Sequence, residues 1–260
     1  MGHEHIKLDR TGWVATVTLD RPGTRNACSM SMWLAIRDHF REIAASDARA
    51  VVLTGANGDF CSGADVVTSS GSEGFQGSHL TAMRLLAESV LAVHSCPLPV
   101  IVKVDGVSVG AGFGLALAGD LLFCSDRSRF SAVFAKRGLS LDYGTSWFLA
   151  QRIGLHKAKE LAFTAEMMSG ARAAELGFVN AVLPAAELDA AVARIVEQIA
   201  AGPPIALSMT KRMLDNAGAS SLAHALETEA IAQNVNLGTK DMAEAFVAFR
   251  EKRAPVFQGR

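Results

Sequence analysis

Two glycine-rich turns carry the residues with which this chain could do chemistry. The first spans residues 60–65 after a predicted strand, and the second is Gly110-Ala111-Gly112, which leads into a predicted helix. Glycine lets the backbone turn sharply, and the first N–H groups of a helix are unpaired and carry partial positive charge. Two such turns side by side could each donate one N–H to a single carbonyl oxygen. They would then stabilise negative charge that develops on it.

A second interpretation of the same region uses a serine. Residues 106–110, Gly-Val-Ser-Val-Gly, match the nucleophile-elbow pattern G-x-S-x-G between a predicted strand and a helix. Ser108 would then be the nucleophile of an α/β-hydrolase, with Asp142 and either His156 or His224 following in the required order. Both histidines lie inside helical patterns, and no HGG-type oxyanion segment precedes the serine. The hydrolase is therefore a remote alternative.

The pattern of apolar residues predicts the strands and helices that position these turns. Residues 100–120 begin as a β-branched run typical of a buried strand, turn through glycines and continue as an apolar helix. Leu115 stands where G-x-G-x-x-G needs glycine, so a dinucleotide fingerprint is not met. Upstream, the pattern predicts two strands within residues 5–20, a helix from Ser29 to about residue 45, and a strand at residues 50–54.

The rest of the chain divides into a mixed region and a helical one. Residues 66–78 are rich in serine and glycine and predict a mobile surface loop. Apolar residues such as Phe246, Phe249 and Phe257 predict that the C-terminal helices pack on the core or on another subunit. We expect a helix at 79–93, strands at 121–125, 130–133 and 179–183, and helices from Gly144 onward with starts at Ser169, Ser220 and Thr239. The predicted organisation is an α/β region over residues 1–198 and a helical segment over residues 199–260.

Composition excludes several classes of function. The 260-residue chain has a formal net charge of −1 and no broad basic surface for nucleic acid. Lys103 interrupts the most apolar run, so we expect no membrane span, and the N-terminal residues lack the apolar centre of a signal peptide. The four cysteines lack CxxC spacing and the seven histidines lack HExxH, so we expect no metal site. These features predict a cytoplasmic protein with reduced thiols.

Several motifs, in one order along the whole chain, resemble those of the crotonase (enoyl-CoA hydratase/isomerase) superfamily. The resemblance implies an α/β fold, a spiral of repeated ββα units, with a C-terminal helical segment that mediates homotrimers, often paired into hexamers. The motifs are the strand-rich residues 14–19 with the Arg-Pro turn of residues 21–27, the two glycine turns, Gly138-Leu139 with Asp142 and Gly144, residues 174–180, and the ending at residues 251–257.

The resemblance also implies the substrate and how it is held. Members of the family bind the thioester oxygen of an acyl-CoA between two backbone N–H groups, which correspond here to Ala64 and Ala111. Abstracting a proton beside the thioester puts negative charge on that oxygen, and a positioned donor stabilises it by roughly 2.7–4 kcal/mol. Coenzyme A enters as part of the substrate, and no separate cofactor is expected. The family's coenzyme A contacts correspond here to Arg25, Ala27, Ala64, Asp65, Val66 and, often from a neighbouring subunit, Lys252.

The catalytic acids depart from the family's hydratase pattern. The two glutamates of the hydratases correspond here to Gly114 and Phe134, which cannot transfer protons. Asp142 matches an aspartate of isomerase-type members, and one carboxylate can take a proton at one carbon and return it at another. An apolar wall of Phe134, Leu139 and Trp147 would raise its pKa. The structural alternative is that Asp142 caps a helix that starts near residue 145.

The resemblance therefore favours double-bond isomerisation of an enoyl-CoA with Asp142 as the proton shuttle. Hydratase activity in fatty-acid or aromatic-acid degradation and a non-catalytic acyl-CoA binder stay open as alternatives. The sequence does not specify acyl chain length, ring character or pathway.

Overall fold

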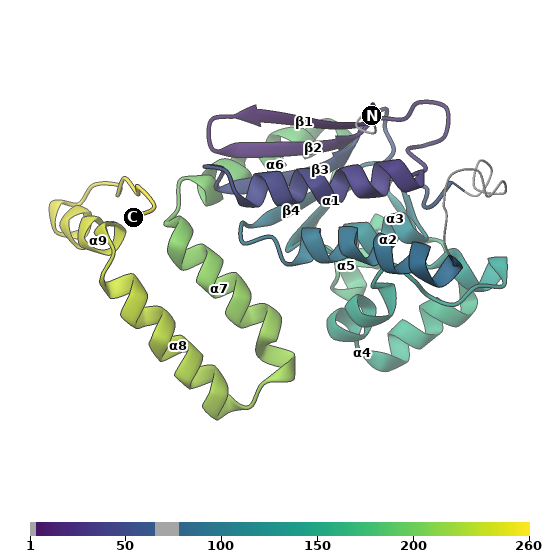
Figure 1. Ribbon diagram of the computed structural model, residues 1–260. Coiled ribbons are helices and arrows are strands. Elements are labelled where there is room, and N and C mark those ends of the chain that lie inside the picture. Colours follow the sequence, from purple (N-terminus) through teal and green to yellow (C-terminus); the bar gives the residue numbers. More distant parts are fainter. Residues whose placement is uncertain (1–3, 66–77) are drawn as a thin grey trace.

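The computed structural model describes residues 4–65 and 78–260. A six-stranded sheet lies at its centre, in the order β1-β2-β3-β4-β6-β9 (Figure 1). Neighbouring strands run parallel except for the antiparallel pair β1 and β2. The strands are β1 (Ile6–Thr11), β2 (Val14–Leu19), β3 (Ala50–Gly55), β4 (Val100–Val104), β6 (Leu121–Ser125) and β9 (Ala181–Leu183).

A second, smaller layer alternates with this sheet along the chain. Two isolated parallel bridges, Cys28 with Ala64 and Cys61 with Ser108, extend it toward the N-terminal part of the chain. The chain repeatedly leaves the main sheet, enters the second layer and then forms a helix, which confirms the predicted spiral of strand–strand–helix turns. The strands of the second layer are β5 (Val107–Val109), β7 (Arg129–Ser131) and β8 (Met168–Ser169).

Helices cover both faces of the main sheet. α1 and α2 lie side by side on one face, and α6 lies against the other (Figure 1). Because side chains alternate along a strand, Val100 and Val102 of β4 face the larger core while Ile101 packs with α6. The bounds are α1 (Met30–Ala44), α2 (His79–His94), α3 (Ala111–Leu117), the 3₁₀ turn η1 (Val133–Arg137), α4 (Thr145–Thr164), α5 (Gly170–Leu176) and α6 (Ala185–Ala200).

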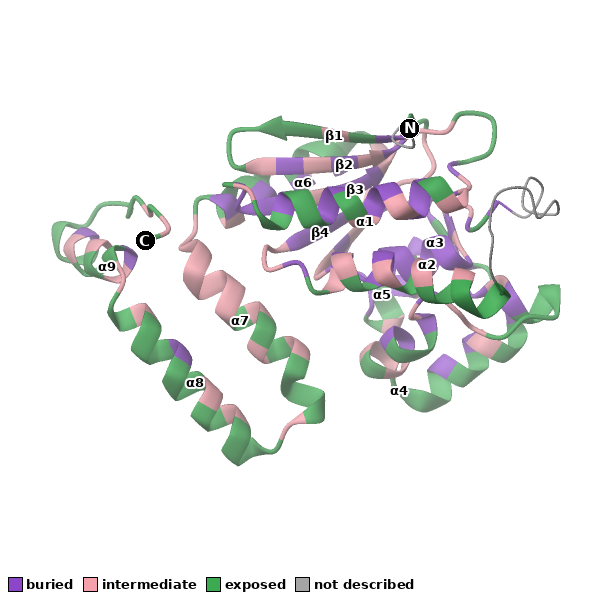
Figure 2. Ribbon diagram, in the orientation of Figure 1, coloured by how far each residue is buried: buried purple, intermediate pink, exposed green. Residues whose placement is uncertain are grey.

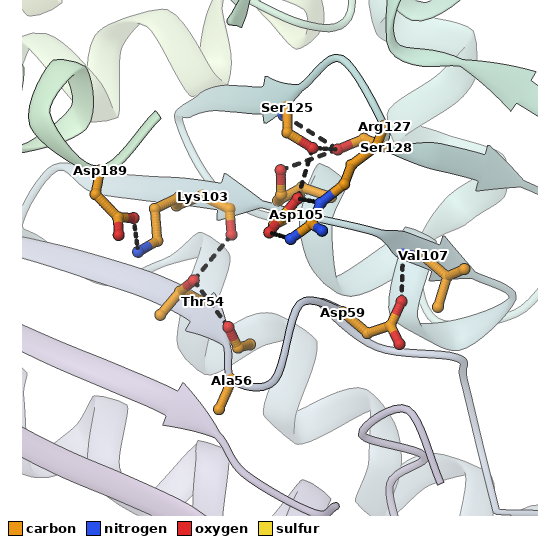
Figure 3. Close-up of polar contacts among 12 residues, drawn as sticks. Thr54, Ala56, Asp59, Lys103, Asp105, Val107, Ser125, Arg127, Ser128 and Asp189 are labelled. Carbon is orange, nitrogen blue, oxygen red and sulfur yellow. Dashed lines mark hydrogen bonds and ion pairs between the residues drawn. The ribbon is translucent and has the colours of Figure 1, made fainter. Parts of the chain in front are cut away.

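Side chains with a carboxylate or an amide tie successive turns of the spiral together where the chain leaves the main sheet. Asn26 Nδ2 donates to the carbonyl oxygen of Asp59 (2.8 Å). The carboxylate of Asp59 in turn accepts from the N–H of Val107 (2.9 Å), and that of Asp105 accepts from the Ser125 hydroxyl (2.6 Å; Figure 3). Each corner is therefore fixed to the next, which sets the stacking of the turns that follow.

The last helices form an arm with few buried side chains. Figure 1 shows α7 and α8 side by side, and Figure 2 shows most of their residues as exposed or intermediate. Leu222 and Phe249 are 75% and 84% exposed. Large apolar side chains gathered at a surface mark interaction sites. The arm consists of α7 (Pro204–Asn216), the 3₁₀ turn η2 (Ala217–Ala219), α8 (Leu222–Leu237) and α9 (Lys240–Glu251).

Local signals predicted most of these elements but not the shortest ones. Ser29, Ser169 and Thr239 cap α1, α5 and α9 as predicted, whereas α8 is capped by Ser221 rather than Ser220. The short strands β5 and β8 were not predicted, because two or three residues give no period. Most of the predicted loop at residues 66–78 lies outside the described residues. Across residues 4–65 and 78–260, no helix combines the length and apolar content that a membrane span requires.

The apolar residues of α2 are buried only on one side of its second half. Val90 and Val93 are buried, but Leu80, Met83 and Leu91 are exposed. The first half of the helix lies at the edge of the core, so its apolar residues have little to pack against in one chain.

Candidate active site

The two predicted glycine turns lie against each other in the structure. A Cβ atom on Gly63 would lie 2.9 Å from the carbonyl oxygen of Val109 and 3.6 Å from the backbone nitrogen of Ala111. A Cβ atom on Gly112 would lie 2.3 Å from the carbonyl oxygen of Cys61. The contacts at 2.9 and 2.3 Å are closer than a side chain tolerates. Glycine at these positions therefore allows the two backbones to meet.

Glycine also sets the direction of each turn. Gly63 has a φ of +103° and Gly110 a φ of +58°, a region that residues with a side chain rarely adopt. The N–H of Gly110 donates to the carbonyl oxygen of Ser131 in β7 (2.9 Å). The turn is thus fixed to the second layer at the point where α3 begins.

The backbone N–H groups of Ala64 and Ala111 are not used by the described part of the chain. The backbone N–H of Cys28 donates to the carbonyl oxygen of Gly63 (2.8 Å), and the carbonyl oxygen of Cys28 accepts from the N–H of Asp65 (2.9 Å). In this parallel pattern the N–H of the intervening Ala64 points to the opposite side. Ala111 is the first residue of α3, so its N–H has no acceptor inside the helix. Within the described ranges, neither N–H has a hydrogen-bond acceptor.

Asp142 lies on a loop that packs against α3, one helical turn after Ala111. A Cβ atom on Gly114 would lie 2.4 Å from the carbonyl oxygen of Tyr143 and 2.8 Å from Oγ1 of Thr145. Gly114 follows Ala111 by three residues, a rise of about 5 Å along the helix. The residues after Asp142 thus fill the space that a side chain at position 114 would need. They also hold this loop near the end of α3 that presents the free N–H.

The surroundings of the Asp142 carboxylate favour its neutral form. Burial raises the pKa of Asp142 to about 6. Its Oδ1 atom is buried and has no hydrogen-bond partner in the described part of the chain. The N-cap of α4 is Gly144, which has no side-chain cap bond. Asp142 therefore does not cap this helix, which removes the structural alternative raised by the sequence.

The apolar wall predicted around Asp142 is only partly present. Phe134 is buried in the main core, but Leu139 is largely exposed. The Trp147 ring packs on His94, with ring centroids 5.4 Å apart, and lines a cavity of about 370 Å³ shared with α7. Leu139 is open to solvent and Trp147 faces the helical arm. Of the three predicted side chains, only Phe134 is buried.

Ser108 is not in the geometry of a nucleophile. It lies in β5, is completely buried, and donates its hydroxyl to the carbonyl oxygen of Gly112 (3.2 Å). A nucleophile elbow exposes its serine at a turn between a strand and a helix. The bond of Ser108 instead braces the turn before α3, and the hydrolase interpretation is wrong.

The residues that correspond to the family's coenzyme A contacts lie on two adjoining segments. The carbonyl of Arg25 accepts from the N–H of Ser62 (3.0 Å), and the bridge between Cys28 and Ala64 continues the contact. The side chain of Arg25 is 70% exposed, 3.8 Å from Asp59. It is the cation at this edge that a phosphate could reach.

A buried ion pair joins the same two segments. The guanidinium of Arg21 pairs with the carboxylate of Asp65 (2.7 Å) and donates to the carbonyl of Ala27 (2.8 Å). Asp65 is 6% exposed. Its side chain therefore holds the Arg-Pro turn against the first glycine turn.

Of the two remaining predicted binding residues, the structure describes only one, and it lies away from this edge. Val66 lies outside the described residues. Lys252 directly follows α9, and Figure 1 shows α9 at the opposite end of the molecule from α3. A contact from Lys252 to this site would have to come from another copy of the chain.

The described residues hold no cluster of three or more His, Cys, Asp or Glu side chains that could bind a metal ion. The four cysteines are free and buried. Cys28 and Cys61 lie beside the two turns with their sulfur atoms 3.8 Å apart. Burial raises the pKa of the Cys28 thiol well above its usual range, so the thiol stays protonated.

Sequence reasoning missed the side chain that anchors the Asp142 loop. Tyr143 is buried, its ring packs on Trp33 with centroids 4.4 Å apart, and its hydroxyl lies 2.5 Å from that of Ser89. One signal was present, since Tyr143 is the single tyrosine of the chain and directly follows Asp142. Its partners on α1 and α2 could not be read from the sequence.

Comparison with known proteins gives matches over almost the whole chain. The family model for enoyl-CoA hydratase/isomerase matches residues 9–260. A probable enoyl-CoA hydratase of Rhodobacter capsulatus is 33% identical, with 100% of both chains covered. The 1,2-epoxyphenylacetyl-CoA isomerase of Escherichia coli is 30% identical over 95% of each chain. The crystal structure of an enoyl-CoA hydratase from Bacillus anthracis superposes with a TM-score of 0.94 at 29% identity, covering 99% of this chain and 100% of that one.

Proposed function

This chain belongs to the enoyl-CoA hydratase/isomerase family, and on that premise we propose that it binds an acyl-CoA thioester and moves a double bond along the acyl chain. The observation that carries the proposal is the partly buried carboxylate of Asp142, whose Oδ1 atom is buried without a hydrogen-bond partner among the described residues and which lies on a loop packed against α3. The oxygen of the thioester would accept from the N–H groups of Ala64 and Ala111.

In the proposed reaction the ionised carboxylate of Asp142 takes a proton from the carbon beside the thioester. The electron pair left on that carbon moves onto the thioester oxygen, giving an enolate that the two N–H groups stabilise. Asp142, now protonated, returns the proton to a carbon farther along the chain, and the double bond shifts. Nothing is added or lost, so one group of intermediate pKa is sufficient.

Two features oppose ordinary two-glutamate hydration. Hydration needs an acid and a base that together activate water and deliver a proton, and the corresponding positions are Gly114 and Phe134. The backbone of Tyr143 leaves no room for a side chain on Gly114, and Phe134 is buried in the core. Hydratase activity is the alternative, supported by the relatives that carry this name. A non-catalytic acyl-CoA binder is the third.

We also propose that coenzyme A reaches the protein only as part of the substrate and that no separate cofactor takes part. Arg25, Ala27, Asp65 and Val66 would line the path of the coenzyme A moiety. Lys252 would reach its phosphates from a neighbouring subunit of a homotrimer or hexamer. The exposed apolar side chains of α8 and α9 support such an assembly.

The deciding experiment offers the purified protein 3-enoyl-, 2,5-dienoyl- and 2-enoyl-CoA and compares it with Asp142→Asn. We expect an isomer product from 3-enoyl-CoA and its loss in the variant, whereas 2,5-dienoyl-CoA, whose C2 is part of a double bond, tests whether the same carboxylate removes a proton from C4. Asp47→Asn, at a carboxylate that is 90% exposed, serves as the matched control. Hydration of the 2-enoyl substrate without isomerisation would favour the hydratase. Thioester binding without turnover of any substrate would favour the binder.

A further inference from the structure

We propose that Tyr143 is a positioning residue: by donating its hydroxyl proton to Ser89, it fixes the loop that carries Asp142 against α3. The inference rests on the proposed function, in which Asp142 moves the proton. It adds a residue that touches neither substrate nor reacting atom, and it explains how a carboxylate whose Oδ1 has no hydrogen-bond partner among the described residues is kept in place.

The first observation is backbone strain next to Asp142. Tyr143 has a φ of +53°, and Gly144, which follows it, has a φ of +74°. A bulky residue in this left-handed region costs about 1–3 kcal/mol and persists only where its surroundings hold it there. Tyr143 therefore needs an anchor that offsets this cost.

The second observation is the anchor itself. The Tyr143 ring packs on Trp33 of α1, and its hydroxyl lies 2.5 Å from Oγ of Ser89 on α2. Ser89 has a single proton, which it donates to the carbonyl oxygen of Leu86 (2.6 Å). The bond between Tyr143 and Ser89 therefore runs from the phenol to the serine. Burial raises the pKa of Tyr143 well above its usual range, so the phenol keeps its proton.

The third observation is what the anchor holds. The carbonyl oxygen of Tyr143 lies against Gly114, and the carbonyl of Asp142 accepts from the N–H of Thr145 (3.0 Å). Oδ1 of Asp142 has no partner in the described residues, so the backbone on either side sets where the carboxylate lies. Releasing the phenol would free that backbone on one side.

Among the described residues, the titratable groups around this anchor are two buried thiols and a glutamate held in an ion pair. Cys28 and Cys61 face the phenol from the neighbouring turns, and burial keeps the Cys28 thiol protonated. On α2, Glu88 is paired with Arg37 and Arg41 of α1. A change in the titration of Asp142 would therefore report on its own exposure to water.

The kinetic test uses Tyr143→Phe, which removes the hydroxyl and keeps the ring. We expect kcat for isomerisation to fall 10- to 100-fold while KM stays within about twofold, because a small displacement of a catalytic group lowers the rate and leaves binding intact. Ser89→Ala should behave in the same way, and the double variant should be no slower than the slower single variant. The matched control is Thr54→Val, which removes another buried hydroxyl, bonded to the carbonyl of Lys103 (3.1 Å; Figure 3).

A second readout does not depend on activity. Carboxyl ¹³C NMR follows the titration of Asp142, whose resonance is identified by its absence in Asp142→Asn. In Tyr143→Phe we expect the pKa of Asp142 to fall by about one unit or more toward that of a solvated carboxyl, and in Thr54→Val to stay unchanged. An unchanged titration in Tyr143→Phe overturns the positioning role. If instead the wild type has no isomerase activity and the titration still moves, the proposed reaction fails and the anchor stands.

Discussion

The carbonyl oxygen of Tyr143 occupies the place where a side chain on Gly114 would begin, 2.4 Å from the Cβ position. A side chain at position 114, where the proposed correspondence with the family puts the first hydratase glutamate, would therefore clash with this backbone. The loop with Asp142 approaches α3 only because position 114 has no side chain. The same backbone contact excludes a side chain at position 114 and holds the Asp142 loop against α3.

The first prediction follows from that contact. Gly114→Glu should not create a hydratase, because even a Cβ atom at this position forces the Asp142 loop away from α3. We expect Gly114→Ala and Gly114→Glu to lower the free energy of unfolding by about 1–3 kcal/mol, as overpacked sites do. Both should also lower isomerase activity. Chemical denaturation and the assay with 3-enoyl-CoA measure the two effects.

Gly238→Ala is the control for this prediction. The Cβ position there is 3.4 Å from its nearest neighbour and the backbone has a negative φ, so the change should be close to neutral. Hydration of 2-enoyl-CoA by Gly114→Glu at full stability would refute the steric argument.

The second prediction concerns stability and pH. The pKa of Asp142 is raised by burial from its ordinary value of 3.8 to about 6. Between these values the folded state binds more protons than the unfolded state, so this group lowers stability as pH rises from about 4 to 6. The loss is complete above the folded pKa. Because the carboxylate is partly exposed, solvent screening limits the effect to about 1–2 kcal/mol.

Asp142→Asn removes this titration. Compared with the wild type, the variant should gain stability as pH rises from 4 to 7, and the difference between them should stay constant outside that window. Urea unfolding of both proteins at several pH values measures it. A difference that does not vary with pH would show that the carboxyl has an ordinary pKa in the folded state.

The third prediction concerns how kcat/KM for isomerisation depends on pH on the acid side. A base must be ionised to take a proton, so kcat/KM for isomerisation should rise with pH and level off above about 6, the pKa of Asp142. The value reports the free enzyme, which makes it comparable with the titration in the absence of substrate. If kcat/KM instead rose and levelled off near pH 4, the proton transfer would belong to a solvated carboxyl elsewhere.

Much of this site is predictable from sequence because its parts are local. A capping serine at residue 29, β-branched runs and glycine turns each leave a signal within a few residues, and these signals predicted α1, the main sheet and α3. Positions 63 and 110 lie in turns with positive φ, which glycine favours, so their glycines could also be explained from the local pattern. The identity of the two turns as neighbours came from a resemblance, which carries long-range information that a local pattern lacks.

The rest depends on contacts between distant segments. Nothing near Tyr143 indicates that its hydroxyl meets Ser89, 54 residues earlier, or that its carbonyl meets Gly114. The direction of Trp147 was also unreadable, because an aromatic residue one turn into a helix can face either side. Its ring faces His94 rather than the acid. Packing between helices decides such placements, and a single sequence does not display it.

The fourth prediction concerns assembly. Phe249 of α9 is 84% exposed, and Leu222 of α8 is 75% exposed, so the arm needs a partner to bury them. We expect a homotrimer or hexamer in solution and its dissociation in Phe249→Glu, measured by light scattering on a sizing column. Asp126→Lys, a charge change at an exposed residue in the turn between β6 and β7, should leave the mass unchanged. A monomeric wild type at micromolar concentration would contradict the proposed assembly.

The last prediction tests the backbone donors directly. Ala111 is the first residue of α3, where proline fits because the N–H has no acceptor inside the helix. Ala111→Pro therefore removes the proposed donor with little cost to the helix, while Ala111→Gly keeps the donor and loses only a methyl group. We expect kcat/KM to fall about 100- to 1,000-fold in the proline variant, equivalent to roughly 2.7–4 kcal/mol of transition-state stabilisation. The glycine variant should stay within about tenfold of the wild type, since a methyl group contributes only about 1 kcal/mol.

Circular dichroism and thermal unfolding check that both variants fold. Equal activity in the folded proline and glycine variants would show that the thioester oxygen is held by other groups, whatever the role of Asp142.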